Sequence, residues 1–238
     1  GGGVLLLDPV SAGTCFHYFP VYAITVAAFA LVLSCAKSSV GNERMRLFFF
    51  TIGMAIAFFD LMTFPLAAFT LPAAAFAMIH RDEGWRVASD TALLVAMALA
   101  GYAGMWVAKW AVGTILTDVN VFADALGRVA LRTAGNDPEN AVGAWMAVSA
   151  NVRCLIEFVP VFGMLALAEA WMLLKRGLAF NRKGIPAAAT LLGLGVLPFV
   201  WMVLVRQHSF IHAFMVHKTF AVTAFALLAA PQALFNRN

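Results

Sequence analysis

Long apolar runs separated by short polar loops dominate this sequence. They cover residues 18–36, 47–79, 88–108, 152–174, 185–205 and a last stretch that ends near residue 235. A helix of about 20 apolar residues crosses the roughly 30 Å hydrocarbon core of a bilayer, so each run is a candidate membrane span. The run 47–79 is too long for one span and is interrupted by Asp60, Pro65 and Pro72, which predicts a helical hairpin turning near Asp60 to Pro65. The pattern therefore predicts an all-α, polytopic transmembrane bundle of about seven spans.

The longest polar stretch, residues 117–140, has a different periodicity. On a helix, its residues divide between an apolar face with Phe122, Leu126 and Val129 and a polar face with Asp124, Arg128 and Arg132. Gly135 and Pro138 are expected to stop that helix. The pattern is typical of a short amphipathic helix that lies on the membrane surface.

The composition agrees with a membrane protein and differs from that of soluble domains. The 238 residues are 63% hydrophobic and 12% charged, with a mean hydropathy of +0.87, whereas soluble domains carry about a quarter charged residues. The net charge is +4, and the basic residues lie in short loops between spans, where they orient helices. We therefore expect a lipid bilayer as partner and no nucleic acid. Three cysteines without metal-ligand spacing predict no disulfide framework.

The distribution of lysine and arginine predicts the orientation of the chain. If alternate loops face the cytoplasm, ten basic residues lie on that side, namely Lys37, Arg44, Arg46, Arg81, Arg86, Lys175, Arg176, Arg182, Lys183 and Arg237. Six lie on the other side, in longer loops. Because cytoplasmic loops are enriched in such residues, we expect a multi-pass protein of the inner or plasma membrane. Its single transmembrane domain (1–238) would have a cytoplasmic C-terminus and three outer segments, 1–17, 117–140 and 206–218.

The outer segment 206–218, "RQHSFIHAFMVHK", concentrates titratable residues. His208 and His212 are four residues apart, so a helix places them on one face. One interpretation is a polar marker of the membrane interface, and another is a site for an anionic headgroup or phosphate. Arg206 and Lys218 favour phosphate over a metal ion, because cations repel metals and bind phosphate. We therefore expect no metal and no cofactor, and no sequence feature supports a divalent cation.

Two further charged residues lie in apolar surroundings. Asp60 is either an intramembrane acid that faces a cavity or partner, or an interfacial residue of the hairpin turn. Lys109, between Trp106 and Trp110, either extends toward the lipid headgroups or supports a phosphate site. The sequence contains no GxSxG, CxxC, HExxH or Walker motif, so nucleophilic and nucleotide-driven reactions have no positive support.

Three segments resemble large bacterial multi-span proteins of the GT-C glycosyltransferase type. They are "GMAIAFFDLMTFPLAAFTLPAAAF" (53–76), "YAGMWVAKWAVGTIL" (102–116) and "RQHSFIHAFMVHKTFAV" (206–222), in the same order as in that family. The matched positions are Asp60, Thr63 and Pro65 in the first segment, Lys109 and Trp110 in the second, and His208, Ser209 and His212 in the third. His217 and Lys218 stand where the family has an aromatic residue followed by arginine.

The resemblance implies a membrane glycosyltransferase-like protein of cell-surface polysaccharide or glycolipid assembly. It would transfer a sugar from a polyprenyl-phosphate donor to a saccharide or lipid acceptor on the extracytoplasmic face. Asp60 would orient the histidines or act as the catalytic base, while Arg206, His208, His212, Lys218 and Lys109 would bind the lipid phosphate. The family's first outer loop and its acid are not recognisable, so we expect the chain to be the C-terminal portion of a longer one. A transporter or flippase for lipid-linked saccharides and a non-catalytic membrane scaffold remain alternatives.

Overall fold

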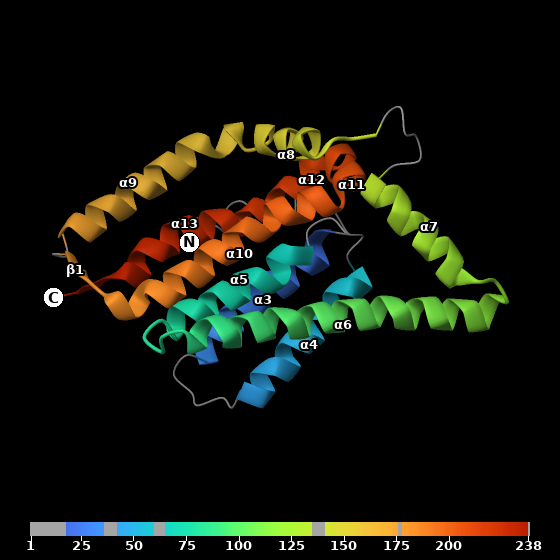
Figure 1. Cartoon of the computed structure of the whole chain (residues 1–238), viewed down its shortest axis with the longest axis horizontal. Helices are drawn as coiled ribbons and strands as arrows, with labels where there is room; N and C mark the ends of the chain where they lie inside the picture. Colours follow the sequence, from blue (N-terminus) through green and yellow to red (C-terminus); the bar gives the residue numbers. More distant parts are fainter. Residues whose placement is uncertain (1–17, 36–41, 60–64, 135–140, 176–177, 238) are drawn as a thin grey trace.

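The structure is a computed structural model that describes residues 18–35, 42–59, 65–134, 141–175 and 178–237 (Figure 1). These residues form an almost entirely helical bundle, as the hydropathy pattern predicts, with one short two-stranded ladder. In chain order the elements are α3 (Tyr18–Cys35), α4 (Asn42–Phe59), α5 (Pro65–Ile79), α6 (Arg86–Thr117), α7 (Val121–Ala134), α8 (Ala144–Arg153), η1 (Ile156–Phe158), α9 (Val159–Lys175), β1 (Leu178–Phe180), η2 (Arg182–Gly184), α10 (Ile185–Leu204), α11 (Arg206–Ile211), α12 (Ala213–Val216), η3 (His217–Thr219), α13 (Phe220–Leu234) and β2 (Phe235–Arg237).

Helix α5 forms the centre of the bundle. All of residues 65–77 are buried, and the helix contacts α3, α6, α10 and α13. Its many alanines allow these neighbours to approach closely, since small side chains permit close backbone packing in membrane bundles. Pro65 occupies the first helical position, where a missing N–H is tolerated, and Pro72 lies inside the helix without ending it. The predicted interruption at Pro72 is therefore absent from the described helix.

Four helical stretches of the described residues are long and apolar enough to cross a membrane: Arg86–Thr117, Ala144–Lys175, Arg182–Leu204 and Ala213–Leu234. The chain is therefore an integral membrane protein, with support for four of the about seven predicted spans. Two further apolar helices are shorter, and α5, with 15 residues, extends only about 22 Å. Helix α4 ends at Phe59 and α5 begins at Pro65, and the residues between them, where the sequence predicts a hairpin turn, lie outside the described part of the chain.

The loops gather at two ends of the bundle (Figure 1). At one end, hereafter the β1 end, lie the α5–α6 turn and the antiparallel ladder that pairs Leu178 with Arg237 and Phe180 with Phe235. At the other end, hereafter the α11 end, lie α7, α11 and α12. The grouping of described loops agrees with the alternation inferred from basic residues. Which end faces the cytoplasm stays a prediction.

Glycines set the closest helix contacts. Helix α4 packs along α6 where Gly53 faces the Ala98 carbonyl and Gly101 faces the Phe50 carbonyl, and a methyl group at either glycine would overlap that carbonyl. Helices α10 and α13 form a similar antiparallel pair, in which the Thr223 hydroxyl donates to the Gly195 carbonyl at 2.7 Å. These contacts fix α6 and the α10–α13 hairpin, which carry the residues discussed next.

Candidate functional site

The histidine segment forms the turn between α10 and α13. Helix α10 ends at Leu204, and Val205 leaves helical geometry with φ −110° and ψ 50°. After α11, the backbone departs from helical geometry again at His212, with φ −106° and ψ 31°. The ring centroids of His208 and His212 lie 4.6 Å apart, as their four-residue spacing predicts. The segment is thus a short helix between two breaks.

This segment is partly buried, although its polar sequence is that of an interface. His208 of α11 is 7% exposed, since α8 and α7 pack over α11, whereas His217 (7% exposed) and Lys218 (2% exposed) lie in η3, which packs against α5 and α13. The His217 ring nitrogen Nδ1 lies 2.9 Å from the Ala213 carbonyl oxygen, and the Lys218 ammonium lies 3.9 Å from the Met215 sulfur. Of the groups proposed to bind phosphate in this segment, Lys218 and His208 are therefore buried, while Arg206 and His212 are partly exposed.

Asn151 connects α8 to α11. Its side-chain nitrogen donates to the carbonyl of Ala147, one turn earlier, and to the carbonyl of Ser209 in α11, both at 2.8 Å. Asn151 and Ser209 are both fully buried. Sequence reasoning did not single out Asn151, because an asparagine at the start of an apolar run looks like an ordinary boundary residue.

Lys109 of α6 is held at the C-terminal end of α4. Its ammonium donates to the carbonyls of Ala57 at 2.7 Å and Phe58 at 3.1 Å. It also lies 5.1 Å from the Phe58 ring centroid and 4.8 Å from the Trp106 ring centroid. A cation at a helix C-terminus satisfies carbonyls that have no partner in the helix, and aromatic rings add favourable cation–π contacts. Lys109 thus fixes the end of α4, directly before Asp60, which itself lies outside the described residues.

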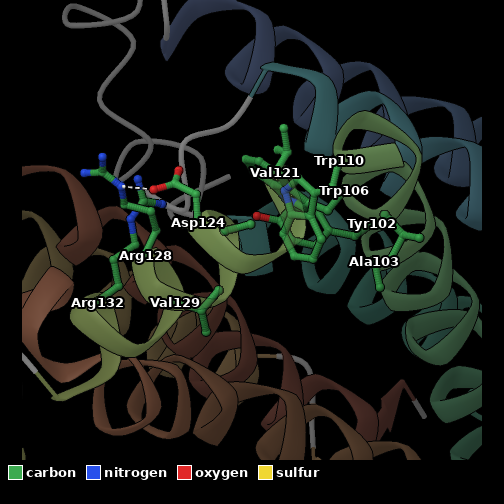
Figure 2. Close-up of a pocket in the computed structure, with 11 residues that line it drawn as sticks. Tyr102, Ala103, Trp106, Trp110, Val121, Asp124, Arg128, Val129 and Arg132 are labelled. Carbon is green, nitrogen blue, oxygen red and sulfur yellow. Dashed lines mark ion pairs between the residues drawn. The ribbon is translucent and has the colours of Figure 1, made fainter. Parts of the chain in front are cut away.

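A pocket of about 460 Å³ lies between α6 and α7 (Figure 2). One wall is an aromatic row on α6, in which Tyr102, Trp106 and Trp110 follow one another at four-residue spacing. Consecutive ring centroids are 6.4 Å and 6.2 Å apart, and Phe122 of α7 continues the row 5.8 Å from Trp110. This four-residue aromatic repeat is a sequence signal that could have revealed the wall.

The other wall comes from α7, the helix predicted to be amphipathic. Figure 2 shows Asp124, Arg128 and Arg132 on the side of the pocket away from the aromatic rings. The Arg128 Nε atom lies 3.6 Å from an Asp124 carboxylate oxygen, and both side chains are largely exposed. Leu126 of the predicted apolar face is 63% exposed, while Ala125 is buried and lines the pocket; the placement of this face on a membrane surface stays a prediction.

These features define an all-helical membrane protein with an aromatic, cation-rimmed pocket and a buried cationic turn at one end. Comparison of the chain with protein-family models, curated proteins and solved structures found no match. In the part of the chain that the structure describes, no three histidine, cysteine, aspartate or glutamate side chains are grouped to hold a metal ion. Function must therefore be argued from the pocket and the cationic turn.

Proposed function

We propose that the protein is a membrane glycosyltransferase-like enzyme that takes a sugar from a polyprenyl-phosphate donor at the α11 end. The pocket between α6 and α7 is the observation that carries this proposal. Its aromatic wall suits an apolar isoprenyl chain, and Arg128 and Arg132 at its rim suit an anionic phosphate. The sequence resemblance supports the same chemistry, and Lys109 and the histidine segment lie at the same end as the pocket.

The reaction needs a base and a stabilised leaving group. The acceptor hydroxyl attacks the anomeric carbon, its proton passes to a carboxylate, and the sugar–phosphate bond breaks with its electron pair remaining on the polyprenyl phosphate. Arg206, Lys218 and the His208–His212 pair stabilise the negative charge of the departing phosphate. Asp60 orients these histidines or accepts the proton.

The test measures binding of radiolabelled C55 polyprenyl phosphate to the protein in nanodiscs. Ala103 lines the pocket, and Ala103→Trp fills it while leaving the aromatic wall in place. We expect at least roughly tenfold weaker binding, equivalent to about 1.4 kcal/mol. The neighbouring Gly104→Trp is the matched control, because a Cβ atom added there meets no atom within 4 Å and Gly104 does not line the pocket. Equal affinity of both variants would contradict the pocket assignment.

Catalysis is tested separately from binding. We expect His208→Ala or His212→Ala to abolish sugar transfer in purified membranes, since the charge on the leaving phosphate then loses a partner. Size-exclusion chromatography checks that the variants remain folded. Folded variants that retain normal transfer would exclude the histidines from the site and leave the pocket as a binding site only.

A transporter or flippase of lipid-linked saccharides is the second candidate. It is favoured by Glu169, the buried residue of α9, whose carboxylate accepts a hydrogen bond from Gln232 of α13 at 3.1 Å. Intramembrane acids of this kind often couple transport to ions. Glu169→Gln should then abolish movement of a fluorescent C55 polyprenyl phosphate across proteoliposomes, whereas an enzyme would retain sugar transfer with this variant.

A further inference from the structure

Helix α8 covers a group of buried polar atoms that have no hydrogen-bond partner. Among the described residues, five such atoms belong to α8, α10 and α11, three helices that contact one another: Asn151 Oδ1, Trp201 Nε1, Arg206 Nε, Gln207 Oε1 and Ser209 Oγ. A buried donor or acceptor without a partner loses its hydration and gains nothing in return. The closed packing of α8 over α11 is therefore destabilised by the very residues that it covers.

The stretch that contains α8 is also the least packed of the four spans. In the apolar 18-residue window of the Ala144–Lys175 span only 6% of the residues are buried within the bundle, against 28%, 39% and 67% for the windows of the other three. In α9 the buried residue is Glu169, which bonds to Gln232. Figure 1 shows α9 running along the outside of the bundle while α8 lies against α11 and α12. The tether at the α11 end is Asn151, through the Ser209 carbonyl.

We propose that α8 is a lid, closed in this structure, whose opening exposes the cationic turn formed by residues 206–218. Helix α11 is bounded by breaks at Val205 and His212, so its polar side chains become hydrated when α8 lifts, without disruption of the α10–α13 pair. Entry of a lipid phosphate to Arg206 through this opening rests on the proposed function. The lid itself rests on the packing of α8.

Thiol accessibility tests the lid. Ser209→Cys is introduced into a chain in which Cys15, Cys35 and Cys154 are replaced by alanine, and the labelling rate with a water-soluble maleimide is measured in nanodiscs. Removal of the tether with Asn151→Leu should accelerate labelling roughly tenfold, equivalent to about 1.4 kcal/mol. Ser149→Ala is the matched control on α8, since the Ser149 hydroxyl bonds within its own helix to Met146 at 3.1 Å.

A second reporter separates lid opening from unfolding. Thr70 is fully buried in α5, so a cysteine there reacts only when the bundle itself opens. The lid predicts that Asn151→Leu accelerates labelling at position 209 and leaves labelling at position 70 unchanged. Equal acceleration at both positions, or no acceleration at position 209, would refute it.

A final measurement tests whether lipid phosphate binds to the turn. If the turn binds it, saturating C55 polyprenyl phosphate should slow labelling at position 209, whereas dolichol-like polyprenol without phosphate should not. A lid that responds to Asn151→Leu but not to polyprenyl phosphate would leave the lid established and refute the phosphate role of the turn. The two proposals therefore fail separately.

Discussion

The α4–α6 crossing allows a sharp prediction about the aromatic wall of the pocket. A methyl group at Gly101 would overlap the Phe50 carbonyl oxygen and lie 2.9 Å from its carbon and 3.2 Å from the Met54 nitrogen. Both neighbours are backbone atoms of a helix, which cannot rotate away as a side chain does. Gly101→Ala must therefore separate α4 from α6, and it must shift Tyr102, the next residue, which begins the aromatic wall.

The magnitude follows from the required separation. Favourable carbon contacts lie at about 3.5–4.0 Å, so the helices must part by about 1 Å. Overpacking of this kind costs about 1–3 kcal/mol. The higher helix propensity of alanine offsets up to about 1 kcal/mol of that cost. We expect Gly101→Ala to lower the free energy of unfolding by about 1–2 kcal/mol, taking the middle of these ranges.

The assay is reversible unfolding in mixed micelles with increasing SDS, followed by tryptophan fluorescence. Gly104→Ala, one turn along the same helix, is the control, because a methyl group there has no atom within 4 Å. It should be neutral or slightly stabilising through helix propensity. If Gly101→Ala is as stable as Gly104→Ala, the close packing of α4 against α6 is wrong.

Four further predictions use the same unfolding assay or the lipid-binding assay. Gly195→Ala should destabilise by about 1–2 kcal/mol, because its methyl group would lie 2.9 Å from a side chain of α13, whereas Gly193→Ala, with open space, should not. Lys109→Met should cost about 1.5–3 kcal/mol by uncapping α4; unchanged stability would contradict that role. Thr223→Val should cost about 0.6 kcal/mol, the value of an interhelical hydrogen bond. Arg128→Ala should weaken binding of C55 polyprenyl phosphate while changing stability by less than about 1 kcal/mol; equal affinity would remove Arg128 from the rim.

The sequence predicted the helices well where hydropathy alone decides them. Helix α3 and helix α10 end within one residue of the predicted runs. Helix α6 is longer than predicted, extending to Thr117 instead of about residue 108. The charge of Lys109 inside this helix is satisfied by the Ala57 and Phe58 carbonyls of α4 and by the rings of Phe58 and Trp106. A charge ends a span only where no neighbouring element compensates it.

The site was less accessible to sequence reasoning because it depends on contacts between distant segments. The spacing of His208 and His212 predicted their proximity, since it is a property of one helix. The burial of Lys218 was not foreseen, because it requires η3 to pack against α5, a helix more than 100 residues earlier in the chain. The role proposed for Asp60 stays a prediction, since that residue lies outside the described part of the chain.

Among the described residues, most of the buried polar side-chain atoms without a hydrogen-bond partner belong to the α11 end, which favours binding chemistry there, although Thr91 Oγ1 near the start of α6 is another. At the β1 end, His80 pairs with Glu83 at 2.6 Å, Arg86 with Asp90 at 3.4 Å, and the β1–β2 ladder pairs the backbone. The unpartnered buried atoms around α11 and the aromatic pocket both belong to the opposite end. Because an unsatisfied buried group lowers stability, its retention is best explained by a partner that binds there. This asymmetry predicts that a ligand binds and stabilises the α11 end and does not contact the β1 end.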